Sequence, residues 1–284
     1  MGMRTIVLTT IAMLAFAANS VLARLALADG AIDAASYTGI RLIAGAVLLY
    51  GLLIWGPHAG AARRIGGSWP GAAALFGYAI FFSVAYLMLG AGLGALILFT
   101  SVQMSMLGWA VFRGDRPGTI EWIGIALAIA SLAYLVSPGL AAPHPLGTVL
   151  MALAGMSWAA YSLIGRGSKS ALADTAGNFV RCLPVAIILA GLGLLTAPVT
   201  YLGVAYAIAS GAIASGLGYA VWYMALPSLS RVQASTVQLT VPAIAAAGGA
   251  FIIGEMFTLR LALAAIGILG GVAIALLAAE RRRR

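Results

Sequence analysis

Charged and chemically reactive side chains are scarce in this chain. Only 8% of its 284 residues are charged, and it contains one cysteine and two histidines. The single cysteine, Cys182, excludes an intramolecular disulfide, and no metal-ligand spacing occurs. The seven carboxylates fall in expected loops or at helix ends, where no nucleophile, base and orienting group converge. These absences argue against an enzyme, and nothing in the sequence calls for a metal or another cofactor.

Apolar residues dominate the sequence instead. They make up 63% of it, and the mean hydropathy is +1.06, as is typical of a membrane protein. Ten apolar runs are long enough to cross about 30 Å of hydrocarbon as helices. We expect these helices at 5–27, 36–55, 69–89, 93–112, 119–137, 146–166, 176–196, 201–224, 233–253 and 259–279. The expected fold class is therefore an all-α integral membrane protein with ten transmembrane helices.

The two halves of the chain resemble each other. The segment Phe16–Arg24 recurs 142 residues later as Trp158–Arg166, with its first two alanines, the serine and the final arginine kept. Further along, Arg181 matches Arg41 and Gln238 matches Gln103, in the same order. Such self-similarity predicts two copies of one structural unit, 1–141 and 146–284.

Five helices per copy is an odd number, so the second copy enters the membrane from the opposite side. The halves then form an inverted repeat, a recurrent plan among transporters with a central binding site. Twelve of the sixteen basic residues face the cytoplasm if both termini lie there, as the positive-inside rule favours. The sequence thus predicts a multi-pass membrane protein with both termini cytoplasmic. The first helix is too long for a signal peptide, and the recurrence of its sequence inside the chain argues against cleavage.

The net charge of +9 does not indicate nucleic-acid binding. The basic residues lie between apolar runs and in the terminal cluster Arg281–Arg284, where lipid headgroups are the expected partner. In the last helix, Gly267, Gly270 and Gly271 form a flat strip that suits packing inside the bundle or, alternatively, a dimer contact. The expected partners are membrane lipids and a small-molecule substrate, and the expected assembly is a monomer or a weak dimer.

The ordered pattern is similar to that of a known family. Arg41 and Arg181 lie inside the second and seventh helices, and Pro242 is followed by Gly254-Glu255. With ten helices in two copies, the pattern resembles the EamA-type branch of the drug/metabolite transporter superfamily, and within it the YddG-type aromatic amino-acid exporters. The resemblance implies a protein of the bacterial inner (plasma) membrane that works by alternating access. It also implies export of small amphipathic metabolites, chiefly aromatic or other neutral amino acids. At Leu107 and Asp115 the chain departs from the family, which often has proline and glutamate there.

Neutral polar and aromatic residues inside the helices are the candidate substrate-binding groups. Rings supply flat apolar faces, and amides and hydroxyls supply hydrogen bonds, a mixture that suits an amphipathic zwitterion. The candidates are Asn19, Tyr78, Phe82, Tyr86, Gln103, Trp158, Tyr161, Tyr219, Trp222 and Gln238. Alternatively, Gln103 and Gln238 hold helices together by hydrogen bonds. Trp55 and Trp122, near helix ends, are expected to be interfacial anchors.

Pro242 is expected well inside the ninth helix, where it lacks an amide hydrogen and clashes with the preceding turn. The helix should kink there, and the kink is either a gating hinge or a static bend. No ionisable residue is expected near the middle of the membrane, so we predict gradient-driven flux by alternating access rather than proton antiport. A multidrug or nucleoside permease is an alternative function, and so is a polytopic interaction or signalling protein without flux.

Overall fold

The computed structural model describes residues 2–55, 65–114, 116–137, 142–165, 168, 170–225, 228–229 and 237–283. The regular elements in these ranges are helices, two of which are π-helices named η. They are α1 (Met3–Leu27), α2 (Ala34–Trp55), α3 (Trp69–Tyr86), α4 (Ala91–Phe112), α5 (Thr119–Val136), α6 (Pro145–Gly165), α7 (Ala171–Thr196), α8 (Tyr201–Ile208), η1 (Ala209–Leu217), α9 (Gly218–Ala225), α11 (Thr240–Gly248), η3 (Gly249–Ile253) and α12 (Leu259–Arg283).

Most of these helices are long and apolar enough to cross a bilayer. Within the described ranges nine spans meet both conditions, and one of them, Tyr201–Trp222, is built from α8, η1 and α9. A further apolar helix, Thr240–Ile253, is shorter. The expected all-helical membrane fold is confirmed. The ninth helix, however, is not continuous over 233–253: a turn at Leu239 interrupts it, and the stretch 230–236 lies outside the described residues.

Helix α7 begins at Ala171, five residues before the start expected from the sequence. The predicted start is later because polar residues before position 176 are typical of a loop. Asp174 Oδ1 accepts a hydrogen bond from the Gly67 amide at 2.7 Å, and Asn178 Oδ1 accepts one from the Ser68 amide at 2.8 Å. These side chains bind the segment before α3, so they do not prevent the helix from starting earlier.

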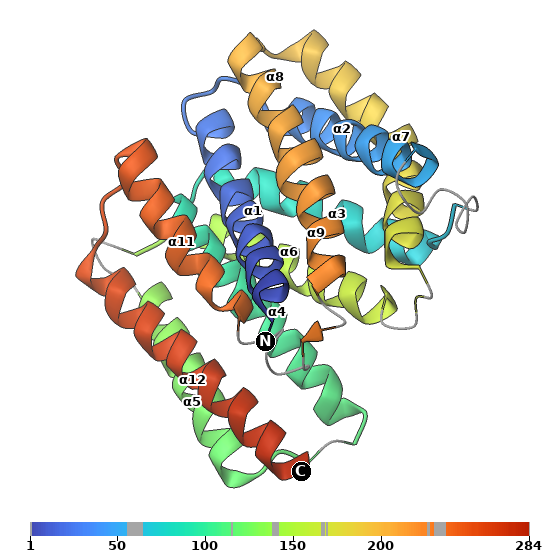
Figure 1. The fold of residues 1–284 in the computed structure, drawn as a ribbon. Coiled ribbons are helices and arrows are strands. Elements are labelled where there is room, and N and C mark those ends of the chain that lie inside the picture. The colour runs from blue at the N-terminus through green and yellow to red at the C-terminus, as the bar shows by residue number, and fades with distance from the viewer. Residues whose placement is uncertain are drawn as a thin grey trace.

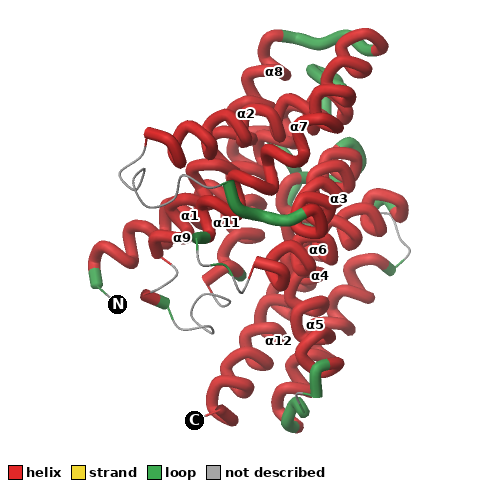
Figure 2. The backbone as a smooth tube through the Cα atoms, turned by 90° about the vertical axis from the view of Figure 1, so that its right-hand side faces the viewer, coloured by secondary structure: helices red, strands yellow, loops and turns green. Residues whose placement is uncertain are grey.

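Packing partners follow a regular pattern. Helix α2 lies along α7, α5 along α12 and α4 against α11, while α3 packs on α6 and α1 packs on the α8–η1–α9 span. Figure 1 shows the α5–α12 pair on one side of the bundle and the α2–α7 pair on the other, and Figure 2 shows the same separation after a quarter turn. If each span of the first five is exchanged with its counterpart among the last five, the same set of pairs results.

Small residues hold the α5–α12 pair close together. A Cβ added to Gly124 would lie 2.5 Å from the Gly271 carbonyl oxygen, and one added to Gly271 would lie equally close to the carbonyl of Gly124. Only glycine permits this approach of two backbones, which is common between membrane helices. Within the glycine strip, Gly267 and Gly271 thus pack inside the bundle against α5, and the alternative of a dimer contact stays a prediction. At the end of the pair, Arg282 Nε donates to Glu121 Oε1 at 2.8 Å.

Candidate functional site

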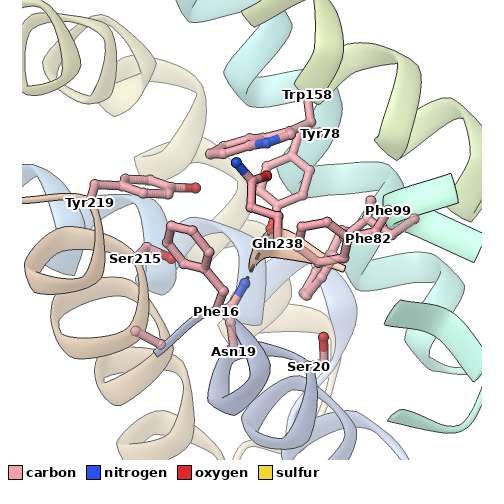
Figure 3. Close-up of a pocket in the computed structure, with 12 residues that line it drawn as sticks. Phe16, Asn19, Ser20, Tyr78, Phe82, Phe99, Trp158, Ser215, Tyr219 and Gln238 are labelled. Carbon is pink, nitrogen blue, oxygen red and sulfur yellow. Dashed lines mark hydrogen bonds between the residues drawn. The ribbon is translucent and has the colours of Figure 1, made fainter. Parts of the chain in front are cut away.

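A small cavity lies inside the bundle, where α1, α3, α4, α6, η1 and α9 meet the segment before α11 (Figure 3). It is lined by Phe16, Asn19, Ser20, Tyr78, Phe82, Leu98, Phe99, Trp158, Ala214, Ser215, Tyr219 and Gln238. The lining thus comes from both halves of the chain and includes six of the expected binding residues. The volume of about 30 Å³ has room for about two water molecules. In this conformation the lining side chains leave no room for a larger molecule.

Aromatic rings form one wall of the cavity. Trp158 and Tyr219 are stacked, with ring centroids 5.1 Å apart and planes at 26°. Tyr78 lies 4.9 Å from Trp158, and Phe16 meets Tyr219 edge-on at 5.8 Å. Figure 3 shows these rings around the amide of Gln238. Ring faces of this kind bind flat apolar groups and attract cations, with roughly 0.5–2 kcal/mol per cation contact.

Asn19 ties the polar part of the wall together. Its Nδ2 donates to Tyr78 Oη at 3.1 Å, and its Oδ1 accepts a hydrogen bond from Ser210 Oγ at 2.5 Å. The Asn19 side chain is buried, so losing either partner would leave one of its amide atoms without a hydrogen bond and away from water. One amide therefore links α1, α3 and η1 beside the cavity.

The eighth span passes the cavity as the π-helix η1. An added Cβ on Gly211 would overlap the backbone of Arg41, so α2 can approach η1 this closely only at a glycine. The widened turns place Ser210 against Asn19 and put Ser215 in the cavity lining. π-helical turns occur frequently at functional sites. This one brings two serine hydroxyls to the wall.

A buried arginine stands directly behind the same wall. Arg41 is 2% exposed, and its Nη2 donates to Tyr78 Oη at 3.1 Å and to Ser215 Oγ at 3.4 Å. Its guanidinium carbon lies 4.7 Å from the ring centroid of Phe82. Because Tyr78 is in the middle of α3, the charge reaches the middle of a membrane span. The expectation that no ionisable residue lies at this depth is wrong, since the long Arg41 side chain extends there from near the start of α2.

The charge of Arg41 is unusual because no carboxylate of the described residues neutralises it. Arg41 pairs with no carboxylate of the described residues, and its Nη1 has no hydrogen-bond partner among them. Removing a charge from water costs several kcal/mol, which cation–π contacts of roughly 0.5–2 kcal/mol each offset only in part. Its sequence counterpart differs, because Arg181 Nη1 donates to the carbonyl oxygens of Gly66 at 2.6 Å and Gly177 at 2.8 Å.

Four of the expected binding residues lie outside the cavity lining. Tyr86 packs behind Phe82, with ring centroids 4.6 Å apart. The rings of Tyr161 and Trp222 pack against residues of the wall, and Gln103 is buried in α4. The equal spacing of Tyr78, Phe82 and Tyr86 along α3 does not bring all three rings to the cavity, because each four-residue step turns the helix face by about 40°. Tyr86, Tyr161 and Trp222 thus support the wall without lining the cavity.

The cavity also contains residues that were not expected. Phe16, Ser20, Phe99 and Ser215 line it, together with two aliphatic residues. The sequence did carry a signal for Phe16, which occupies the position of Trp158 in the repeated segment. Ser215 lies in a run of small residues in which nothing distinguishes one serine from the next.

Gln238 enters the cavity just before the break in the ninth helix. Pro242 is the third residue of α11, so the expectation that it lies well inside a continuous helix is wrong. The turn at Leu239 precedes it, in keeping with the amide hydrogen that proline lacks, and Thr240 Oγ1 donates across the turn to the Val237 carbonyl at 2.7 Å. The Gln238 amide makes no hydrogen bond to another described residue. Movement of Pro242 as a hinge stays a prediction.

A salt bridge lies at the end of the bundle that the charge pattern places outside. Arg24 Nε donates to Glu255 Oε1 at 3.0 Å, and Glu255 Oε2 accepts a hydrogen bond from the Ala91 amide at 2.8 Å. A cavity of about 310 Å³ lies beside this pair. The position of Glu255 at a helix end beside Arg260 leaves two interpretations open from the sequence, a solvated loop charge or an interface salt bridge, and the structure has a salt bridge, formed with Arg24. Arg260 instead donates to the Tyr134 carbonyl oxygen at 2.8 Å.

Comparisons with known proteins agree with this arrangement. The model of the EamA-like transporter family matches residues 145–277. The uncharacterized protein PA1977 of Pseudomonas aeruginosa is 49% identical over 96% of this chain and 94% of its own length. The threonine/homoserine exporter RhtA of Escherichia coli is 30% identical over 61% of this chain and 64% of its own length. A solved crystal structure superposes with a TM-score of 0.64 and 19% identity over 97% of this chain and 98% of that one, a likeness of fold alone. The chain therefore belongs to the EamA-like transporter family and is not an enzyme.

Proposed function

We propose that this chain exports small amphipathic metabolites, chiefly aromatic or other neutral amino acids, through the central cavity. The observation that carries the proposal is the meeting of aromatic rings, amides and hydroxyls from both halves of the chain in that cavity. The relationship to RhtA, named as a threonine/homoserine exporter, supports the same substrate class. A neutral amino acid combines the flat or apolar group and the polar end that such a lining accommodates.

Transport requires the cavity to open. Its volume of about 30 Å³ is too small for an amino acid, so side chains must withdraw. Gln238 is well placed to do so, because it enters the cavity just before the turn at Leu239 and has no described hydrogen-bond partner. A change of angle at this break, next to Pro242, would carry Gln238 away from the rings. The break is therefore our proposed hinge.

The two halves, 1–141 and 146–284, act in this proposal as inverted repeats that rock against each other. Both the repeated sequence segments and the packing pairs that survive exchange of the halves support this symmetry. The Arg24–Glu255 pair would then hold the outer end shut while the inner end exchanges substrate. Both termini are placed in the cytoplasm.

Flux in this proposal follows the substrate gradient. Among the residues that line the cavity there is no aspartate, glutamate, histidine or lysine to carry a proton. Arg41 lies close by, but a guanidinium does not release its proton in proteins. Imposed pH gradients are therefore expected to leave the final distribution of a neutral amino acid unchanged in proteoliposomes.

The direct test is efflux from cells that are loaded with labelled amino acids and express the chain. We expect faster efflux than from cells without it, and a loss of most of that gain in Tyr78→Ala, Trp158→Ala and Gln238→Ala. The matched control is Trp69→Ala, which removes an exposed tryptophan at the start of α3. Equal efflux with and without the chain, at verified expression, would refute amino-acid export.

A further inference from the structure

The charge of Arg41 reaches the cavity through two hydroxyl groups. Its Nη2 donates to Tyr78 Oη at 3.1 Å and to Ser215 Oγ at 3.4 Å, and both of these residues line the cavity. Its Nη1 is buried without a hydrogen-bond partner among the described residues, and none of their carboxylates pairs with it. The wall formed by Tyr78 and Ser215 is therefore electropositive and has capacity for an anion.

The Tyr78 hydroxyl accepts two hydrogen bonds and keeps its own hydrogen to donate. Asn19 Nδ2 and Arg41 Nη2 both donate to Tyr78 Oη, each at 3.1 Å. These two bonds occupy the lone pairs of the phenolic oxygen, so its own hydrogen is left for another acceptor. A hydrogen bond to an ionised acceptor is shorter and stronger than one to a neutral acceptor. A carboxylate is thus the acceptor that this hydroxyl and the cation behind it favour.

We propose that the transported substrate carries a carboxylate, which accepts the Tyr78 hydroxyl hydrogen and is neutralised by Arg41. The inference rests on the proposed export of amino acids and names the group by which the site selects them. The ammonium group or the ring of the substrate then lies against the stacked faces of Trp158 and Tyr219, on the same cavity. A lipophilic cation has no anion to offer and is repelled by Arg41, and an uncharged nucleoside leaves the charge unpaired.

The sequence counterpart of Arg41 shows what a purely structural arginine looks like in this fold. Arg181 Nη1 donates to the carbonyl oxygens of Gly66 and Gly177 and so joins α7 to the segment before α3. Backbone carbonyls bind Nη1 of that side chain. Among the described residues, by contrast, Arg41 donates only to hydroxyls of the cavity wall, and its Nη1 has no hydrogen-bond partner. The different surroundings of the two arginines separate a ligand-binding role from a packing role.

The test compares each amino acid with the amine that remains when its carboxylate is removed. Phenethylamine is the partner of phenylalanine, and 1-aminopropan-2-ol is the partner of threonine. Competition against labelled amino acid is measured with the full-length chain in proteoliposomes, and binding is followed separately as protection against heat. We expect the wild-type chain to prefer the amino acid at least tenfold, and Arg41→Gln to reduce that ratio to near one. Arg41→Lys should retain part of it.

Two further variants keep the test decisive. Tyr78→Phe preserves the ring and should lower the preference about tenfold, so it answers the question if Arg41→Gln does not fold. Arg181→Gln is the matched control and should leave the ratio as in the wild type. An unchanged ratio in Arg41→Gln, or in Tyr78→Phe if the former is unfolded, would overturn the carboxylate site while leaving amino-acid transport intact. If the wild-type chain neither binds nor transports any amino acid, the proposed function fails and the carboxylate site fails with it.

Discussion

The indole of Trp158 touches three other rings in the interior of the bundle. Its centroid lies 4.9 Å from that of Tyr78, 5.1 Å from Tyr219 and 5.4 Å from Tyr161. Because Tyr78 and Tyr219 belong to different halves of the chain, the indole joins the two halves at the cavity. A residue in this position serves packing and recognition together.

Replacing Trp158 with alanine should therefore weaken substrate binding about tenfold, since aromatic pairs contribute about 0.5–1.5 kcal/mol beyond the area they bury. The measurement is the concentration of amino acid that gives half-maximal flux in proteoliposomes. Trp55→Ala removes an indole that is 84% exposed at the end of α2 and should leave that concentration unchanged. An unchanged value in Trp158→Ala as well would mean that the ring wall does not contact the substrate.

For single residues, the sequence predicts which residue types form the site better than it predicts how far and in which direction their side chains extend. Tyr78 and Trp158 are recognisable as rings inside apolar helices, and both line the cavity. Tyr86 shares the spacing of Tyr78 but turns away, because the helix face rotates along α3. The depth of the Arg41 charge is not predicted correctly. A position in the sequence gives the depth of the backbone in the membrane, whereas the long Arg41 side chain carries its charge to Tyr78 in the middle of α3.

Among the helices, the break before α11 is where motion is expected. Pro242→Ala restores an amide hydrogen and allows the helix to extend through Leu239, which should fix Gln238 in the cavity. We expect both the maximal flux and substrate binding, measured by heat protection, to fall several-fold, because the cavity then stays too small for an amino acid. Pro184→Ala is the control, because Pro184 also lies inside a helix, α7, but does not line the cavity. Equal flux in wild type and Pro242→Ala would make the break a static feature.

At the end of the bundle that is proposed to face outward, Glu255 joins Arg24 of α1 to the first residue of α4. Glu255→Gln removes the charge that holds these elements together, so the outer end should open more often. A cysteine placed at Leu93, in the adjoining cavity, should then react several-fold faster with a membrane-impermeant thiol reagent. Glu121→Gln breaks a comparable pair with Arg282 elsewhere and should not alter that rate. No acceleration in Glu255→Gln would show that the pair does not gate the outer end.

Hydropathy alone is enough to locate most of the helices, because each must present about 20 apolar residues to lipid. It does not reveal the π-helix η1, which depends on close backbone contact at Gly211 and leaves no periodic pattern. The early start of α7 is hidden for a similar reason, since Asp174 is polar yet binds a neighbouring loop. Features set by contacts between elements are the ones that a single sequence conceals.

For the whole molecule, the proposed inverted repeat requires both termini on the same face of the membrane. The chain has only one cysteine, and Cys182 is buried, so introduced cysteines can be labelled without first removing it. Cysteines at Gly2 and Glu280 should be protected in intact cells and labelled after permeabilisation. One at Asp29, exposed in the turn after α1, should be labelled in intact cells. Termini labelled from opposite faces would contradict the topology.

The repeat also anticipates how the spans pair. Matching segments such as Phe16–Arg24 and Trp158–Arg166 identify α1 and α6 as counterparts, and each packs on the third span of the other half. What the repeat does not anticipate is the difference between counterparts. Arg41 donates to hydroxyl groups of the cavity wall, whereas Arg181 donates to backbone carbonyl oxygens.

The central claim is that neutral amino acids pass through the cavity between the two halves. Counterflow with the purified chain in proteoliposomes tests it most directly, with labelled phenylalanine or threonine outside and the unlabelled amino acid inside. We predict transient accumulation of label without any pH or voltage gradient, and its near loss in Trp158→Ala. Absence of counterflow for every neutral amino acid, in the same vesicles that exchange a lipophilic cation or a nucleoside, would contradict the account.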